Sequence, residues 1–320
     1  MAQLYGEVEG THNVNAIKNF LSYVEISTKI ASVFPFLVGA GFVMYRYGSL
    51  RPKQTLVFFF SMLLFDMTTT ALNNHVGHRQ TGRVPHYRAS ISVAIFLTMG
   101  LCALALGIYL VSITSIVILL AGMFCFGVGV LYNYGPLPIA RTPFGELVSG
   151  TVMGIFIPFI AVEITRSMIG IAFPEFSRLV ISVDWLNAGA LGLAVMPLIC
   201  CIANIMLANN ICDMQEDVSV HRYTLPFYIG LKKSLWLYKR IYATAYVFII
   251  IASVLGIVPI FSVITLLTII PVRKNIRRFN DIQDKRQTFI TAVKNFLIIL
   301  TPYTACIWLG ALMRSLTANA

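Results

Sequence analysis

Charged residues are scarce in this chain of 320 residues. Asp, Glu, Lys and Arg together make up only 12% of it, whereas an ordinary soluble domain contains about 25%. Hydrophobic residues account for 58%, and the mean hydropathy is +0.79. So much apolar surface cannot be buried in one water-soluble core. The composition therefore excludes a soluble globular domain and indicates an integral membrane protein.

The sequence also lacks a disulfide framework, a zinc motif and a signal peptide. Five of its six cysteines lie inside apolar runs, and none has metal-ligand spacing with a histidine. Residues 1–28 contain several acidic residues and no early apolar block, unlike a signal peptide. We expect residues 1–25 to form a cytosolic or interfacial segment, residues 26–314 the transmembrane domain, and residues 315–320 a short tail.

Apolar runs between polar breaks predict an all-α, polytopic membrane protein with about nine transmembrane helices. Each run has roughly the 17–25 residues that a bilayer-spanning helix needs. Charge-free junctions at 111–114 and 255–258 predict tight turns between neighbouring spans. The predicted spans are 26–46, 55–74, 92–111, 113–132, 147–166, 188–208, 239–256, 257–272 and 291–312.

The distribution of basic residues predicts the orientation of these spans. With a cytosolic N-terminus, 18 of the 24 Lys and Arg residues fall on the cytosolic side, as the positive-inside rule requires. The net charge of +11 is then explained by anionic headgroups, so no nucleic acid is expected as a partner. We expect a multi-pass protein of the cell membrane, whose partner is the lipid bilayer.

Carboxylates are the rarest charged groups, and they cluster at one place. Of only 13 acidic residues, Asp213, Glu216 and Asp217 fall within five positions at the cytosolic end of a predicted span. On a helix, Asp213 and Asp217 would lie on the same face and repel each other. Mg²⁺ commonly binds one or two carboxylates together with phosphate oxygens, and the cations Arg222 and Lys232 that follow suit a diphosphate. A solvated helix end is the alternative.

Two stretches resemble the UbiA superfamily of intramembrane prenyltransferases. The segment "NNICDMQEDVSVHRYTLPFYIG" (209–230) is similar to the second aspartate motif of the family. Its Asn-Asn-x-x-Asp-x-x-x-Asp pattern followed by Thr-Leu resembles the 1,4-dihydroxy-2-naphthoate prenyltransferases of menaquinone biosynthesis. The segment "YNYGPLPIARTPFGELVSG" (132–150) is similar to the family's Tyr-x-x-Gly-Pro-x-Pro…Gly-Glu loop.

This resemblance implies a UbiA-like bundle with its active site at the cytosolic face. It implies Mg²⁺-dependent transfer of a polyprenyl group from a polyprenyl diphosphate to an aromatic acceptor, with Asp213 and Asp217 as catalytic metal ligands. In the branch named, the acceptor is dihydroxynaphthoate, which loses carbon dioxide and yields demethylmenaquinone. The substrate-binding residues expected at this end are Tyr132, Arg141, Asn210, Arg222 and Lys232.

Two of these expectations have structural alternatives. Arg141 either contacts the diphosphate or the naphthoate carboxylate, or it is a positive-inside anchor. Tyr132 either lines the acceptor pocket or belongs to an interfacial aromatic belt.

The family's first aspartate motif, Asn-Asp-x-x-Asp-x-x-x-Asp, is altered in this chain. The matching stretch "NNHVGHRQT" keeps Asn73, but Asn74, Gly77 and Thr81 stand where the family has aspartates. We expect Asn73 to bind the metal, and Asn73 and Asn74 to bind substrate. Asp66 lies seven residues before Asn73 on the same helix face. It is expected to be catalytic, by supplying the missing charge or by binding the acceptor's hydroxyl; hydrogen bonds to neighbouring threonines are the alternative.

Other classes of function remain open from the sequence. A transporter or channel of small anions would use the same basic rim, but it predicts inverted repeats, and none is evident. A pseudoenzyme that binds quinones or prenyl lipids would keep the fold and lose half of the metal site. A prenyltransferase with another aromatic acceptor would keep both motifs.

Overall fold

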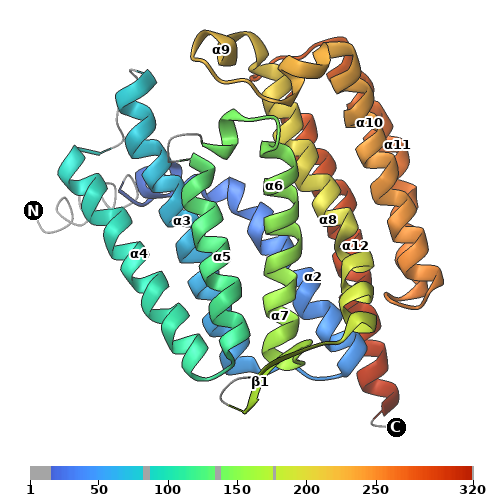
Figure 1. The fold of residues 1–320 in the computed structure, drawn as a ribbon. Coiled ribbons are helices and arrows are strands. Elements are labelled where there is room, and N and C mark those ends of the chain that lie inside the picture. The colour runs from blue at the N-terminus through green and yellow to red at the C-terminus, as the bar shows by residue number, and fades with distance from the viewer. Residues whose placement is uncertain (1–15, 82–86, 134–137, 176–177, 319–320) are drawn as a thin grey trace, which may run out of the picture. The chain divides into compact units, whose positions relative to one another are not determined.

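The computed structural model describes residues 16–81, 87–133, 138–175 and 178–318, and nearly all of them are helical (Figure 1). Helices suit a chain dissolved in lipid, because each helix bonds its own backbone N–H and C=O groups. The elements in chain order are η1 (Ile26–Lys29), α2 (Ile30–Tyr47), α3 (Pro52–Thr81), α4 (Ala89–Ser112), α5 (Ile116–Asn133), η2 (Ile139–Arg141), α6 (Gly145–Thr151), the π-helical η3 (Val152–Phe156), α7 (Ile157–Thr165), β1 (Ile169–Glu175), β2 (Arg178–Val183), α8 (Trp185–Cys212), α9 (Met214–Ser219), α10 (Leu225–Val254), η4 (Ile260–Thr268), α11 (Ile269–Asp281) and α12 (Ile290–Ala318).

The chain divides into two compact units. The first contains Leu56–Leu110 and the chain up to Val33; the second contains Phe34–Thr55 and Val111–Ala320. In the first unit, Tyr23 is almost fully buried against α3 and α4. Its hydroxyl donates to the carbonyl oxygen of Ala71 at 2.8 Å and is hydrogen-bonded to the Ser92 hydroxyl. Tyr23 thus ties the helical residues 16–23 to both long helices of this unit.

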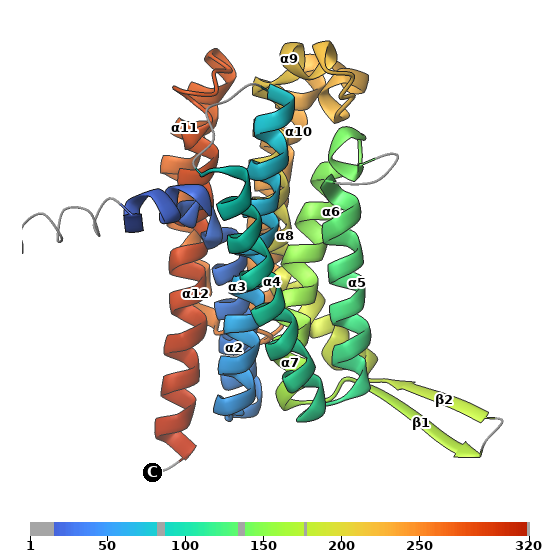
Figure 2. The same ribbon diagram turned by 90° about the vertical axis from the view of Figure 1, so that its left-hand side faces the viewer.

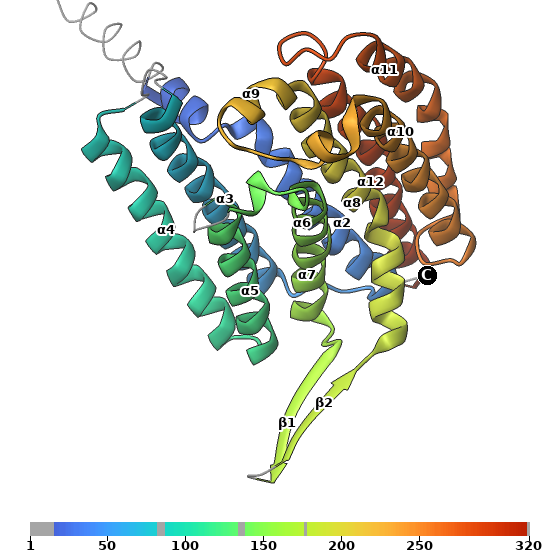
Figure 3. The same cartoon turned by 45° about the horizontal axis from the view of Figure 1, so that its top comes forward.

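The second unit is built around α8. This helix packs against α6, α10 and α12, and the views in Figures 1 and 3 show α10, α11 and α12 gathered beside it. Leu198 and Leu207 of α8 are fully buried, as is Tyr303 of α12. The Tyr303 hydroxyl donates to the carbonyl oxygen of Ala194 at 2.7 Å, so the one polar atom of this ring is satisfied inside the core.

Close contact of α6 and η3 with α8 depends on two glycines spaced four residues apart, Gly150 in α6 and Gly154 in η3. A Cβ atom at Gly150 would lie 2.9 Å from the carbonyl oxygen of Ile199, and one at Gly154 would lie 2.7 Å from the Ile199 side chain. Small residues at this spacing let membrane helices approach closely. The π-helical η3 begins between them, at Val152.

A two-stranded antiparallel hairpin joins α7 to α8, which the all-α prediction did not include (Figures 2 and 3). Ile169 faces Val183 across it, and Ile171 faces Ile181. Glu163 fixes its base, because the Glu163 carboxylate accepts hydrogen bonds from the Ser167 hydroxyl and from the Met168 N–H, both at 2.7 Å. The hairpin lies at the N-terminal end of α8, opposite to the end that carries the acidic cluster.

The expectation of about nine spans agrees with the structure. Seven helices among the described residues are long and apolar enough to cross a membrane, and Ile116–Tyr132 adds a shorter apolar helix. The predicted span 257–272 corresponds to η4 and the first residues of α11 rather than to one continuous helix. At the C-terminus, α12 continues to Ala318, beyond the end of the predicted transmembrane domain.

Candidate functional site

The acidic cluster lies where α8 ends, in the second unit. Asp213 is not helical (φ −92°, ψ 3°), so α8 stops at Cys212 and α9 starts at Met214. The Asp217 N–H nevertheless donates to the Asp213 carbonyl oxygen at 2.8 Å. Asp213 and Asp217 are therefore still about one helical turn apart, although the break between α8 and α9 replaces the single continuous helix expected from the sequence.

Asp213 is bound by a lysine from a distant loop. Lys285, between α11 and α12, forms an ion pair with the Asp213 carboxylate. Asn209 completes the group: its side-chain amide donates to Asp213 Oδ2 at 3.2 Å, and its Oδ1 accepts a 2.5 Å hydrogen bond from Lys285 Nζ. Because Lys285 is exposed, the pair is accessible from water.

Asp217 is more deeply buried and is bound by Arg222. The Asp217 side chain is only 7% exposed, and its Oδ1 lies 3.3 Å from an Arg222 guanidinium nitrogen. Asp217 Oδ2 is buried and has no hydrogen-bond partner among the described residues. Burial raises the pKa of Asp217 above its usual value, and the positive charge of Arg222 offsets part of this rise.

Arg222 connects this carboxylate to a second one. Its Nε donates to the Ala140 carbonyl oxygen, and its NH2 group donates to Asn210 Oδ1, both at 3.0 Å. The Asn210 side-chain amide in turn donates to Glu146 Oε1 at 2.8 Å. Glu146 is buried at the start of α6, and its Oε2, like Asp217 Oδ2, has no partner among the described residues. Both motifs that resemble the UbiA superfamily thus meet through Arg222 and Asn210.

The other residues predicted for this end lie around the same group. Arg141 is exposed at the end of η2, and its carbonyl oxygen accepts a hydrogen bond from the Tyr223 N–H at 3.1 Å. The Tyr132 hydroxyl points to the Gly145 carbonyl oxygen at 3.5 Å, next to Glu146. Lys232 is exposed on α10, just after Gly230 interrupts the helix with a φ of 77°. Their roles in binding remain predictions.

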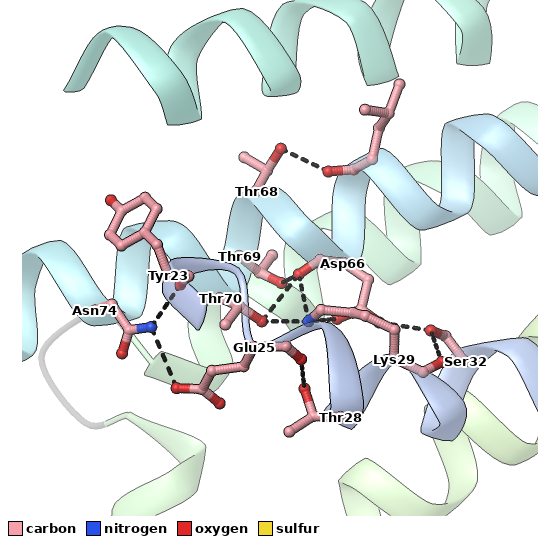
Figure 4. A network of polar contacts seen from close by, with 11 residues as sticks. Tyr23, Glu25, Thr28, Lys29, Ser32, Asp66, Thr68, Thr69, Thr70 and Asn74 are labelled. Atoms are coloured by element: carbon pink, nitrogen blue, oxygen red, sulfur yellow. Dashed lines mark hydrogen bonds and ion pairs between the residues drawn. The ribbon is translucent and has the colours of Figure 1, made fainter. Parts of the chain in front are cut away.

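Asp66, in the first unit, is held by a buried lysine (Figure 4). Lys29 Nζ lies 2.8 Å from Asp66 Oδ1, and it also donates to the Thr70 hydroxyl at 2.5 Å. Ser32 donates to Asp66 Oδ2 at 2.5 Å. The hydroxyls of Thr69 and Thr70 donate to the backbone carbonyl of Asp66, not to its carboxylate. The Lys29 side chain is 4% exposed, so this is an ion pair inside the protein.

Asn74 of α3 binds the segment that precedes α2. Its side-chain amide donates to the Tyr23 carbonyl oxygen at 2.8 Å and to Glu25 Oε1 at 3.2 Å. Both contacts are drawn in Figure 4. Asn73 is half-buried on the same helix. The altered motif positions Gly77 and Thr81 lie in residues 76–81, whose side-chain surroundings are outside the described part of the structure.

The oxygen atoms at the end of α8 fit a hard divalent ion such as Mg²⁺. Asp217 Oδ2 and Glu146 Oε2 are buried carboxylate oxygens without a partner among the described residues, and such atoms are costly unless a proton or a cation satisfies them. No three His, Cys, Asp or Glu side chains in the described part of the chain are grouped closely enough to hold a metal. A Mg²⁺ ion held here by one or two carboxylates would need water and phosphate oxygens to complete its shell.

Among the residues of these networks that were not predicted to belong to the site are the charged residues Glu146, Lys29 and Lys285. Glu146 lies inside the motif that was recognised, and its sequence position could have indicated it. Lys29 and Lys285 carry no local signal, because their partners are 37 and 72 residues away. Only folding brings each lysine to its aspartate.

The chain is similar to known proteins in both sequence and fold. The model of the UbiA prenyltransferase family matches residues 32–312. The chain is 27% identical over 235 residues to the 1,4-dihydroxy-2-naphthoate octaprenyltransferase of Bacillus subtilis (strain 168), which covers 70% of each protein.

Two solved structures are similar in fold. One is a digeranylgeranylglyceryl phosphate synthase, with a TM-score of 0.61, 14% identity, and coverage of 93% of this chain and 99% of the other. The second is a UbiA homologue from Archaeoglobus fulgidus bound to GPP and Mg²⁺, with a TM-score of 0.59, 13% identity, and coverage of 92% and 99%. With a family model that spans most of its length and several apolar helices, the chain belongs to the UbiA prenyltransferase family and is a multi-pass membrane prenyltransferase.

Proposed function

We propose that this enzyme transfers a polyprenyl group from a polyprenyl diphosphate to 1,4-dihydroxy-2-naphthoate in the biosynthesis of menaquinone. The observation that carries the proposal is the group formed by Asp217, Arg222, Asn210 and Glu146, in which the two recognised motifs meet. The naphthoate acceptor is supported by the similarity to the Bacillus subtilis enzyme. We place this reaction at the cytosolic face of the cell membrane, where the basic segments are expected.

The protein's own residues would stabilise the diphosphate as it leaves. Breaking the allylic C–O bond sends the electron pair to the diphosphate and leaves a carbocation on the prenyl chain. Arg222 and Lys285 each carry a positive charge at this end of α8 and are partly exposed, so each can turn from its aspartate toward phosphate oxygens. The ring carbon that bears the carboxylate then forms the new C–C bond, and carbon dioxide departs in place of a proton.

Mg²⁺ would be held by Asp213 and Asp217, and it would supply positive charge to the diphosphate. Asn73 stays a proposed ligand from the first unit. Asn210 would keep the Arg222 guanidinium oriented, because its amide links Arg222 to Glu146. Asp66, which is paired with Lys29, would accept a hydrogen bond from the acceptor's hydroxyl.

The test is an assay of the purified protein with radiolabelled prenyl diphosphate and dihydroxynaphthoate, with and without Mg²⁺. We expect labelled demethylmenaquinone only when the acceptor and Mg²⁺ are both present. Parallel reactions with 4-hydroxybenzoate and with a glycerol phosphate acceptor serve as controls. Turnover with one of these and none with the naphthoate would contradict the proposed acceptor.

A second candidate, a quinone or prenyl-lipid binder without catalysis, is favoured by the altered first motif, where Asn74 replaces an aspartate and binds Tyr23 and Glu25. Saturable binding of prenyl diphosphate without turnover of any acceptor would support it against the proposed reaction.

A further inference from the structure

Helix α11 has an apolar buried side and an exposed side that is mainly basic and ends at Asp281. Val272, Ile276 and Phe279 are buried against the rest of the second unit. The residues beside them point outward and form two rows with i, i+4 spacing. These exposed cations are Arg273, Lys274, Arg277 and Arg278.

The cations begin where an apolar surface ends. Just before them, Leu267 is 71% exposed and Ile270 is 77% exposed. Large apolar side chains this exposed, on a protein of this composition, face lipid tails. Arg273 follows Ile270 by three residues, less than one helical turn. The change from apolar to basic residues therefore marks the level at which the bilayer surface meets α11.

Helix α10 shows the same change from exposed apolar residues to exposed basic residues. Val247 and Val254 are exposed apolar residues, and toward the start of the helix they give way to the exposed Lys239 and Arg240. The Arg240 guanidinium lies 5.1 Å from the ring centre of Trp236, which is 58% exposed. An exposed tryptophan beside an arginine is typical of the headgroup level.

The two helices lie side by side at this level. The rings of Tyr238 and Phe279 are 4.9 Å apart, directly beside Lys239 and Arg278 in the sequence, and Figure 1 shows α10 and α11 as neighbours. Their cations therefore form one surface, which we call the basic band: Lys239, Arg240, Arg273, Lys274, Arg277 and Arg278.

The basic band carries more positive charge than nearby carboxylates balance, since the six cations share α11 and α10 with one exposed carboxylate of α11, Asp281, four residues after Arg277. None of its six side chains forms an ion pair with a described residue, whereas Lys29, Arg222 and Lys285 each do. Like charges so close together repel each other unless anions lie between them. Anionic groups at the bilayer surface are the phosphates of acidic phospholipids, and about 1 kcal/mol per nearby Lys or Arg is gained by such contact.

We propose that the basic band is a binding site for the headgroups of anionic phospholipids such as phosphatidylglycerol. The apolar residues below it receive the acyl chains, while the cations and Trp236 contact the phosphate level. This distinguishes the lipid from a nucleic acid or an acidic protein, neither of which would use the adjoining exposed Leu267 and Ile270. Lipid binding at the basic band would be independent of the acceptor and of prenyl transfer.

Trp236 provides a reporter at the site itself. The chain has three tryptophans, so Trp185→Phe with Trp308→Phe leaves Trp236 alone. This protein is reconstituted in bilayers of equal parts phosphatidylcholine and phosphatidylglycerol, with brominated acyl chains on one lipid at a time. We expect bromine on phosphatidylglycerol to quench Trp236 as if that lipid were enriched about fivefold at the site, which corresponds to about 1 kcal/mol. High salt should abolish the preference.

Two matched controls assign the effect to the basic band. The variant R273Q/K274Q/R277Q/R278Q should lose the preference, and R273K/R277K/R278K, which keeps the charge, should retain it. A protein with Trp185 alone, at the other end of α8, should show no preference. Equal quenching of Trp236 by both brominated lipids in the otherwise unchanged protein would overturn the proposal, even if the neutralised variant failed to fold.

Discussion

Asp213 and Asp217 are four residues apart, yet each is held by a different cation. Lys285 binds the more accessible Asp213, and Arg222 binds the buried Asp217. The sequence showed that two carboxylates at this spacing need positive charge. It could not show which residues provide it, because one partner is five positions away and the other lies on a loop 72 residues away.

The raised pKa of Asp217 predicts how the metal requirement changes with pH. A buried carboxyl that keeps its proton to higher pH competes with a divalent ion for that oxygen. Below this pKa, the Mg²⁺ concentration for half-maximal rate should rise by about tenfold per pH unit, and above it should be constant. Measuring prenyl transfer against Mg²⁺ at several pH values checks this.

Asp217→Asn should lower the rate by at least about 100-fold and remove this pH dependence, because the amide cannot be protonated in the same range. Glu216→Gln, at the exposed neighbouring carboxylate, should behave like the unchanged protein. Equal effects of the two substitutions would show that only net charge matters.

Restoring the family's aspartate at position 74 should destabilise this protein. The Asn74 amide donates to the Tyr23 carbonyl oxygen and to Glu25, so Asn74→Asp would place three acceptors together. We expect the substitution to destabilise the first unit by about 1–3 kcal/mol. Thermal unfolding in detergent measures the change. Adding Glu25→Gln, which supplies a hydrogen-bond donor, should recover part of the lost stability. If Asn74→Asp alone left the stability unchanged, the contacts of Asn74 with Tyr23 and Glu25 would not contribute to it.

The helices follow from hydropathy, whereas the irregular elements do not. Long apolar runs predicted α2, α3, α4, α8 and α12 because lipid permits few other structures. The hairpin was missed because only a few residues of β1 and β2 alternate between apolar and polar, and because both strands lie between two spans. The span predicted at 257–272 was expected to be one helix, yet η4 and the first residues of α11 share it. The basic side of α11 begins at Arg273, directly after the predicted end of this span.

Replacing a glycine that packs against α8 should change the stability in the opposite direction from replacing a glycine of α5 that has no close neighbour. Gly150→Ala and Gly154→Ala would each bring a Cβ within 3.0 Å of α8 atoms, and we expect each to destabilise the protein by about 1–3 kcal/mol. Gly122→Ala and Gly127→Ala on α5 meet nothing within 4 Å, and should stabilise it by about 0.5–1 kcal/mol. Unfolding in detergent compares the four variants; stabilisation at all of them would exclude the close approach.

The membrane orientation of the whole molecule is a prediction from charge. In the second unit, the hairpin and the acidic cluster lie at opposite ends of α8, whose 28 residues span about 42 Å. Single cysteines near Arg178 and at the loop that carries Lys285 should therefore react with impermeant reagents from opposite sides. The second should react only from the cytosol, since basic segments are retained there. Labelling of the Lys285 loop from outside would reverse the orientation.

The buried pair of Lys29 and Asp66 has a consequence for biosynthesis. These residues belong to the first two spans and are 37 positions apart, so at about 5–20 residues per second Asp66 is made roughly 2–7 s after Lys29. Until then the first span carries an unpaired ammonium group, which lipid disfavours. The first two spans are therefore expected to leave the insertion machinery together. Nascent chains arrested before Asp66 should be extracted from membranes by urea at neutral pH, and those arrested after it should not.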